Sequence, residues 1–274
     1  MDLVIRRARR SDKRDVLAAV RTIWGGQDRI PDVFDRWVTH RTGPFFVAES
    51  SGRVVGMGKL TILNEDEGWL EGGRVAPRWR RRGIATALIA HRIAVARDRG
   101  IRLLRFSTGS DNLPIHLAAR RFGFRRVAVM WRHEAPANGG EPPRRARAAD
   151  TAGVARTIGP YIQVGRGWEW RTLTAGDLRS AIRRRQAFVG DSRDGAAAIL
   201  GPSDDGSLPV VAIGGRGRAL RDLLAGLRAE AARRGLEDVS FYAADALQIR
   251  AARSADYRPP WSGRAYLFEK RFKT

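Results

Sequence analysis

Residues 75–85, which read Val-Ala-Pro-Arg-Trp-Arg-Arg-Arg-Gly-Ile-Ala, have the residue types of a phosphate-binding turn. We expect a strand to stop at Pro77 and a long helix to begin near Gly83. The first N–H groups of a helix have no partners within it and lie at its positive end, where phosphate oxygens bind well. Gly83 would let the backbone approach a ligand closely. Positive charge would come from three adjacent arginines, Arg80, Arg81 and Arg82. A basic turn with one glycine also precedes many helices that bind nothing, so the turn alone leaves both interpretations open.

The surrounding pattern resembles the GNAT superfamily of N-acetyltransferases. Residues 80–85 match the family's Arg/Gln-x-x-Gly-x-Gly/Ala signature, which here also includes Ile84 and Ala85. Val75-x-Pro77, Asn112 and the Phe122-Gly123-Phe124 ending fit as well, so the likeness covers residues 3–133. It implies that acetyl-coenzyme A is the co-substrate, with its pyrophosphate on the amides of this turn. It further implies that the pantetheine arm lies along the main chain of Arg74 and Val75. Asn112 resembles a position that often faces the coenzyme; its alternative role is to cap the following helix.

Acetyl transfer to an amine needs a neutral amine, a polarised thioester carbonyl and a proton for the leaving thiolate. Glu71 is the best candidate for the base or amine anchor, because on a strand it would share a face with Gly73 and Val75. A solvent-facing glutamate is the alternative. Many family members carry a tyrosine as the general acid, where this chain has Ala119. His116, one turn earlier, could supply the proton near neutral pH, unless it only packs on its helix.

Apolar periodicity predicts the elements that would position these residues. The first half alternates strands and helices, with a hairpin at Ser51-Gly52 and a helix end at Gly100. Strands are expected at residues 4–7, 45–49, 54–63, 71–76, 103–107 and 125–133, and helices at 12–24, 31–41, 82–99 and 113–121. The predicted fold class is α/β (α+β), a mixed, mostly antiparallel twisted sheet flanked by helices.

The second half repeats features of the first. Arg6-Arg7-Ala8-Arg9 before Asp12 recurs as Arg144-Arg145-Ala146-Arg147 before Asp150. Three further matches follow at similar offsets, which predicts two diverged copies of one domain. The prediction is an N-terminal domain at residues 1–135 with the acetyl-coenzyme A site, a Pro/Gly-rich linker at 136–143 and a degenerate GNAT-like domain at 144–274. Two unrelated α/β domains with a shared Arg/Ala bias are the alternative.

The second copy has lost the signature, because Arg218 stands where the first copy has Gly83. We therefore expect one coenzyme per chain. Trp168, Trp170 and Trp261 could line an acceptor pocket, although large apolar residues more often belong to a core.

Composition excludes several classes. The chain has no cysteine, so disulfides, thiolate metal sites and cysteine nucleophiles are excluded. Four histidines without close pairing predict no metal site, and the apolar runs are too short for a membrane span. We expect a cytoplasmic protein and leave homodimer formation open. The net charge of +22 comes mainly from arginines spread along the chain. Such a charge can indicate binding of nucleic acid or of an anionic ligand, but a GC-rich coding bias would also produce it.

The leading hypothesis is an N-acetyltransferase that moves an acetyl group from acetyl-CoA to a primary amine of a small molecule or protein, by direct attack. One alternative is a catalytically weak acyl-CoA-binding sensor, which the residue Ala119 motivates. A basic nucleic-acid- or ribosome-associated protein is the other, less favoured because no aromatic platform accompanies the arginines. The acceptor carries no motif in this sequence.

Overall fold

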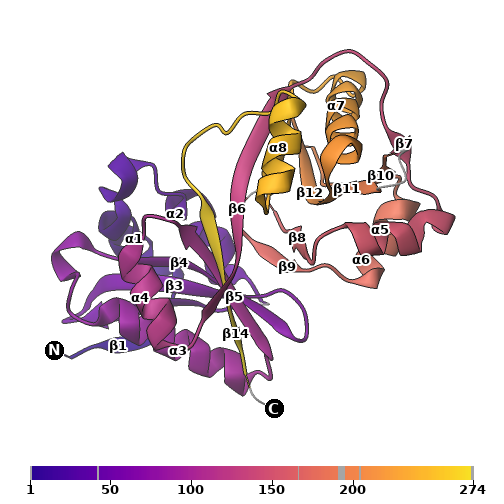
Figure 1. Cartoon of the computed structure of the whole chain (residues 1–274). Coiled ribbons are helices and arrows are strands. Elements are labelled where there is room, and N and C mark those ends of the chain that lie inside the picture. Colours follow the sequence, from indigo (N-terminus) through magenta and orange to yellow (C-terminus); the bar gives the residue numbers. More distant parts are fainter. Residues whose placement is uncertain (1, 42, 166, 191–194, 204, 273–274) are drawn as a thin grey trace. The chain divides into compact units, whose positions relative to one another are not determined.

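The computed structural model describes residues 2–41, 43–165, 167–190, 195–203 and 205–272 (Figure 1). The chain divides into two compact units, and each contains a mixed, mostly antiparallel sheet flanked by helices. The first unit comprises Met1–Phe106, Leu113–Arg125 and Phe268–Thr274, and the second comprises Ser107–Asn112 and Arg126–Leu267. The predicted fold class is confirmed.

The first unit alternates strands and helices as its periodicity predicts. Its elements are β1 (Val4–Arg7), η1 (Arg10–Asp12), α1 (Lys13–Val20), η2 (Ile23–Gly26), α2 (Ile30–Thr39), β2 (Phe45–Ser50), β3 (Arg53–Ile62), β4 (Glu67–Val75), η3 (Pro77–Trp79), α3 (Ile84–Asp98), β5 (Leu103–Gly109), which ends in the second unit, and α4 (Leu113–Arg121). The strand order is β1-β2-β3-β4-β5, and the last residues of the chain add β14 (Ala265–Arg271) beside β5. The pairs β1–β2, β2–β3 and β3–β4 are antiparallel, whereas β4 and β5 are parallel.

Successive residues of β2 serve opposite faces of this sheet, as strand geometry requires. Phe45 packs with Phe34 and Trp37 of α2 on one face. Phe46 packs with Ile84 and Leu88 of α3 on the other. The sheet of the first unit is therefore covered on both faces.

From β7 (Arg144–Arg145) onward the second unit has a similar order of elements, with a hairpin in the place of η2. It contains β6 (Arg125–Pro136), β7 (Arg144–Arg145), η4 (Ala148–Asp150), α5 (Thr151–Thr157), β8 (Tyr161–Gln163), β9 (Trp170–Thr172), α6 (Ala175–Arg183), β10 (Ala187–Val189), β11 (Ala196–Leu200), β12 (Ser207–Gly215), α7 (Gly217–Arg233), β13 (Asp238–Ala243) and α8 (Ala246–Ser254). Its strand order is β6-β13-β12-β11-β10-β7, and β12 and β13 are its parallel pair. β8 and β9 form a separate hairpin.

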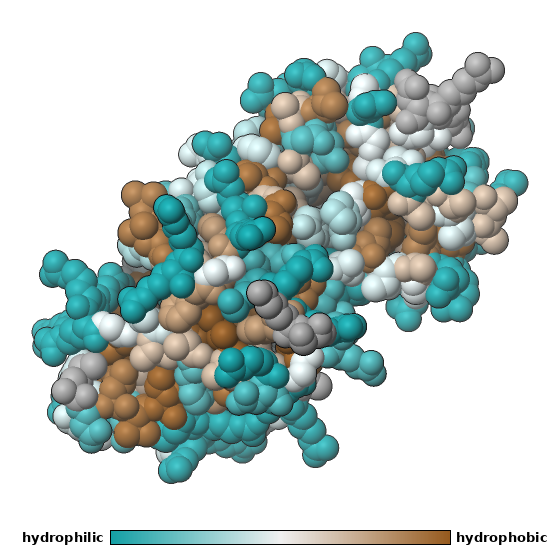
Figure 2. All heavy atoms as spheres, turned by 60° about the horizontal axis from the view of Figure 1, so that its bottom comes forward, coloured by the Kyte–Doolittle hydropathy of each residue, from teal (hydrophilic) through white to brown (hydrophobic). Residues whose placement is uncertain are grey.

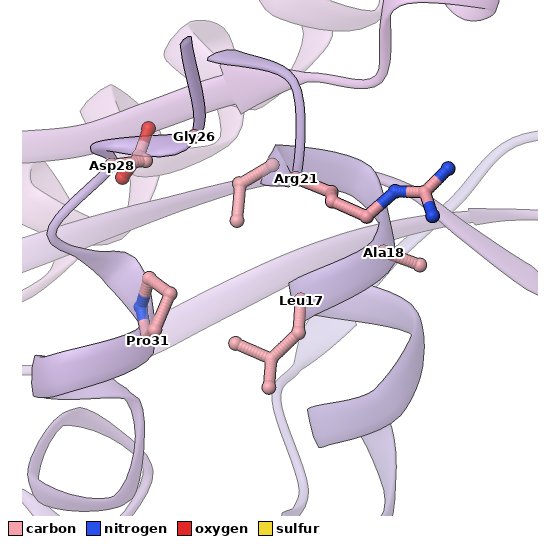
Figure 3. A pocket seen from close by; sticks show the side chains of 7 residues that line it. Leu17, Ala18, Arg21, Gly26, Asp28 and Pro31 are labelled. Carbon is pink, nitrogen blue, oxygen red and sulfur yellow. The ribbon is translucent and has the colours of Figure 1, made fainter. Parts of the chain in front are cut away.

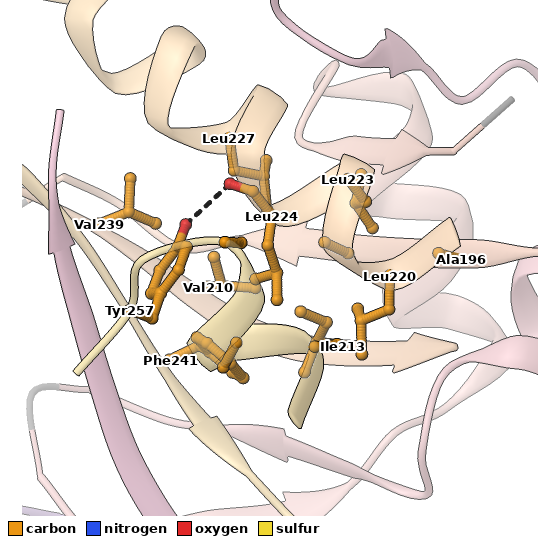
Figure 4. Close-up of a cluster of buried hydrophobic side chains, with 14 of the residues drawn as sticks. Ala196, Val210, Ile213, Leu220, Leu223, Leu224, Leu227, Val239, Phe241 and Tyr257 are labelled. Carbon is orange, nitrogen blue, oxygen red and sulfur yellow. Dashed lines mark hydrogen bonds between the residues drawn. The ribbon is translucent and has the colours of Figure 1, made fainter. Parts of the chain in front are cut away.

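The core of the second unit lies between α7, α8 and the sheet (Figure 4). Leu220, Leu223, Leu224 and Leu227 of α7 are all at most 1% exposed. Tyr257 is fully buried and donates its hydroxyl to the carbonyl of Leu224 at 3.0 Å. Because no anion is stabilised there, burial raises the pKa of Tyr257 far above its usual range.

The repeated sequence features adopt the same local structure in both units. Arg6 donates both terminal nitrogens to the carboxylate of Asp12, each at 2.8 Å, and Arg144 contacts Asp150 in the same way at 2.8 and 3.0 Å. Each aspartate also accepts the backbone N–H of the residue three positions earlier at 2.7 Å. In both units this Arg–Asp bracket joins a strand, β1 or β7, to the short helix that follows it, η1 or η4.

Candidate coenzyme and acceptor site

The turn before α3 has the backbone geometry of an anion site. Gly83 is the N-cap of α3 and adopts a φ of +80°, and Arg81 is also left-handed, with a φ of +62°. A Cβ placed on Gly83 would meet no atom within 4 Å, so open space lies in front of the turn. The first helical hydrogen bond runs from the N–H of Ala87 to the carbonyl of Gly83 at 2.9 Å. The N–H groups of Ile84, Ala85 and Thr86 come before it and therefore have no partner within the helix.

The arginines of the turn have no acidic partner among the described residues. All three are exposed. Nε of Arg80 donates to the carbonyl of Val75 at 3.4 Å, and the guanidinium of Arg82 lies 5.0 Å from the ring centre of Trp79. Unpaired positive charge, free amides and open space fit a pyrophosphate. Of the predicted coenzyme residues Arg80 to Ala85, all are exposed except Ile84, which is 1% exposed and packs in the core.

Strand β4 separates from β5 before it reaches the turn. The two strands pair at Glu67, Gly68 and Trp69, whereas β4 continues to Val75. Over the last part of β4, the main chain of Arg74 and Val75 pairs with β3 on one side. The opposite edge is where the family resemblance implies that a pantetheine arm lies, and this placement stays a prediction.

A bulge in β4 corrects one step of the sequence interpretation. The register with β3 shifts between Met57 and Lys59, at Gly72 and Gly73. Consequently Glu71 lies on the α1/α2 face, whereas Val75 packs with α3, and the prediction that they share a face is wrong. Strict alternation fails because a bulge inserts an extra residue into one strand.

A buried arginine, which the sequence patterns did not predict as part of the site, lies beneath this bulge. Arg92 of α3 is 4% exposed and donates to the carbonyls of Leu88 at 3.0 Å, Lys59 at 3.3 Å and Glu71 at 3.2 Å. A side chain at Gly58 would overlap its guanidinium. Burial lowers the pKa of Arg92 to about 10, against the opposing charge of Glu71. Its spacing after Ile84 and Leu88, on the apolar row of the predicted helix, is the signal that could have identified it.

Glu71 is held by two partners on the α1/α2 face. Its side chain is 14% exposed. Oε1 accepts a hydrogen bond from the hydroxyl of Thr61 at 2.5 Å, and Oε2 accepts one from Arg29 at 3.1 Å. A carboxylate bound in this way can anchor an ammonium group and accept its proton.

Lys59 extends this network below Glu71 and was also missed from the sequence. It is 1% exposed, and Nζ donates to Thr61 Oγ1 at 2.7 Å and lies 3.5 Å from Nδ1 of His40. Burial, together with the charge of Lys59, lowers the pKa of His40. His40 is therefore neutral at neutral pH.

The remaining predicted residues lie on or near α4. His116 is partly buried, with its ring centre 5.6 Å from that of Phe268. Ala119 is 3% exposed and faces the interior. Asn112 groups with the second unit, where its side chain donates to Thr108 at 2.9 Å. Their roles toward the coenzyme stay predictions.

A small cavity opens between α1 and the loop that leads to α2 (Figure 3). Its volume is about 320 Å³. The lining is mostly apolar and consists of Leu17, Ala18, Val20, Arg21, Gly26, Asp28 and Pro31. Asp28 uses both oxygens, one for Arg74 Nε at 2.6 Å and one for the N–H of Ile30 at 2.9 Å. The described lining includes no predicted site residue.

The corresponding place in the second unit differs. Arg216 alone separates β12 from α7 and serves as the N-cap, so the connection is shorter than the turn of the first unit. The end of β12 also forms a bridge between Gly214 and Ile158 of its own unit. In the first unit the corresponding strand edge could accept a pantetheine arm. In the second unit this edge is shorter, and Ile158 pairs with part of it.

The three tryptophans proposed for an acceptor pocket belong to the second unit. Trp168 and Trp261 stack with ring centres 6.3 Å apart. Trp170 is 2% exposed and meets the ring of Tyr242 edge-on at 5.2 Å, so it is a core residue.

The described residues also bear on metal binding and on membrane spans. Among the described residues, no group of three His, Asp or Glu side chains could hold a metal ion. Within the same ranges, every helix is too short or too polar to cross a membrane.

Comparison with known proteins agrees with this geometry. Residues 13–124 match the model of the acetyltransferase (GNAT) family. The uncharacterized N-acetyltransferase YedL of Escherichia coli is 33% identical over 70 residues, which are 26% of this chain and 44% of that protein. A histidine N-acetyltransferase of Oreochromis niloticus is 29% identical over 83 residues, which are 30% of this chain and 25% of that protein. The chain thus spans less than half the length of each relative.

A solved structure extends the likeness in fold to the whole chain. A GCN5-related N-acetyltransferase from Sphaerobacter thermophilus matches with a TM-score of 0.62 and 14% identity, over 99% of this chain and 96% of that one. Residues 13–124 thus match the GNAT family of acetyltransferases, and the likeness over the remainder of the chain is one of fold.

Proposed function

We propose that this protein transfers an acetyl group from acetyl-coenzyme A to a primary amine by direct attack. The observation that carries the proposal is the turn at Gly83, where free amides, three arginines and open space coincide. In the reaction the amine nitrogen bonds to the acetyl carbon, the carbon–sulfur bond breaks, and the proton lost by the amine balances the proton gained by the thiolate. Each chain would bind one coenzyme and no metal.

The roles of the residues follow from their positions. Arg80 to Ala85 would hold the pyrophosphate, and the main chain of Arg74 and Val75 would align the pantetheine arm. Glu71 would anchor the acceptor amine and take its proton. Since the methyl side chain of Ala119 has no proton to donate, the proton for sulfur would come from His116 or from water.

We also propose that the second unit is a diverged copy that binds no coenzyme. The repeated Arg–Asp bracket, the common order of elements and the fold match over nearly the whole chain support this relation. The predicted boundaries at residues 135 and 144, and a cytoplasmic location, belong to this proposal.

Two other functions stay candidates. A sensor that binds acyl-CoA without turnover is favoured by alanine at position 119. Nucleic-acid association would rest on the net charge of +22. On the face shown in Figure 2, hydrophilic side chains are spread and interrupted by hydrophobic groups, which favours this candidate less than a single basic stripe would.

Release of free thiol from acetyl-CoA in the presence of a panel of primary amines tests the proposal. We expect amine-dependent release by the wild-type protein and at least about 100-fold slower release by Glu71→Gln, because general-base catalysis contributes about that much. Coenzyme binding without release for any amine would instead support the sensor. A steep fall of RNA or DNA affinity with salt, without coenzyme binding, would support nucleic-acid association.

A further inference from the structure

An accessible ion pair lies beside the proposed amine anchor. Arg29 Nη2 is 3.1 Å from Glu71 Oε2, and the two side chains are 49% and 14% exposed. The neighbouring pair of Arg74 and Asp28 is closed, because the Asp28 side chain is 1% exposed and both of its oxygens are used. A ligand can therefore reach the first pair and not the second.

The guanidinium of Arg29 keeps donors for a further partner. One of its five N–H groups points to Glu71, and its carbon lies 5.5 Å from the ring centre of Trp37. Stacking on a ring orients the planar fork without using its donors. Because a guanidinium pairs well with a carboxylate through two parallel bonds, Arg29 can receive an acid group.

The local charge argues against a polycationic acceptor. Lys59 and Arg29 contribute two positive charges, Glu71 contributes one negative charge, and His40 is neutral because burial and the charge of Lys59 lower its pKa. These groups sum to about +1, and the buried Arg92, which contacts the Glu71 carbonyl, raises the local charge to about +2, since the pair of Arg74 and Asp28 adds none, within a chain whose net charge is +22. Polyamines would be repelled, whereas an acceptor that also carries an anionic group would balance the site.

We propose that the acceptor is a free α-amino acid, bound with its amine on Glu71 and its carboxylate on Arg29. This inference rests on the proposed function and names the acceptor class of that site. A bare amine would have to displace Arg29 from Glu71, but an α-amino acid places opposite charges side by side and can open the pair without leaving either charge unmatched. Once bound, the ammonium gives one proton to Glu71, the nitrogen bonds to the acetyl carbon, the carbon–sulfur bond breaks, and the second proton lost by the nitrogen is balanced by the proton that the thiolate gains from His116 or water.

The test compares each amino acid with the amine that lacks only its carboxylate. Suitable pairs are leucine with isoamylamine, phenylalanine with phenethylamine and histidine with histamine. We expect the wild-type protein to prefer the amino acid by roughly 10–100-fold in kcat/KM, the range expected for a charge-assisted contact. Arg29→Gln should remove most of this preference through KM, because the amino acid loses its carboxylate contact and the bare amine no longer has to displace Arg29 from Glu71, while the affinity for acetyl-CoA should change by less than about 3-fold.

Arg14→Gln is the matched control. Arg14 lies on α1 of the same unit, is 94% exposed and contacts Asp15 at 3.4 Å. The preference should survive this substitution. Equal use of both members of every pair, or the same loss for both in Arg29→Gln, would overturn the inference and leave the proposed function standing. If no amine of either kind is acetylated, the proposed function fails as well.

Discussion

Gly83 and Gly100 flank α3 and provide a matched pair of substitutions. Gly83 precedes the helix with a φ of +80°, and Gly100 follows it with a φ of +75°. A Cβ at either position meets no atom within 4 Å. Asparagine is among the residues that tolerate the left-handed region best, so each Gly→Asn change should cost about 1 kcal/mol or less in folding free energy. The two variants therefore differ mainly in where the new side chain projects.

At Gly83 the asparagine side chain would enter the space in front of the free amides of Ile84, Ala85 and Thr86. Displacing a phosphate from two of these amides removes two charge-assisted hydrogen bonds, worth about 1.5 kcal/mol each. The expected loss is about 3 kcal/mol, or roughly 100-fold in Kd. Calorimetric titration with acetyl-CoA measures this loss, and Gly100→Asn should bind as the wild type does. An unchanged Kd in Gly83→Asn, or an equal loss in both variants, would refute the assignment of the turn.

Three further outcomes are expected. Arg92→Met should lower the free energy of unfolding in urea by about 3 kcal/mol, because three carbonyls lose a donor worth about 1 kcal/mol each; a loss below about 1 kcal/mol would contradict this role. The hydrogen bond from Arg171, aided by Thr174, lowers the pKa of Asp177 from 3.8 to about 2. A carboxyl group with a lowered pKa stabilises the fold fully above pH 3.8, and this stabilisation is lost as the pH falls through 2. The loss of unfolding free energy in Asp177→Asn should therefore shrink over this window. A loss that does not depend on pH would contradict this prediction. Titration with acetyl-CoA should give one site per chain, and a stoichiometry of two would show that the second unit also binds.

Local patterns made much of the fold and the geometry of the turn before α3 predictable. The apolar row of α3, the glycine after its last turn and the basic segment before it all follow from short-range rules. The recurrence of Arg6 and Asp12 at residues 144 and 150 predicted a repeat, and the bracket now has the same contacts in both units. These features depend on neighbours within a few residues.

The acceptor side was less predictable because it depends on long-range contacts and on departures from regular geometry. The bulge at Gly72 and Gly73 placed Glu71 on the other face from Val75. The first helix was expected to reach Trp24, but α1 ends at Val20, the backbone leaves the helical region at Thr22, and Trp24 and the two glycines after it have positive φ values. Arg29 lies 42 positions before Glu71 in the sequence, so no local pattern could join them.

The most direct test of acetyl transfer is mass spectrometry of a reaction that contains the full chain, acetyl-CoA and one amino acid. We expect an N-acetylated product in an amount equal to the free coenzyme A released. Free coenzyme A without acetylated amine, or no conversion while acetyl-CoA remains bound, would contradict it.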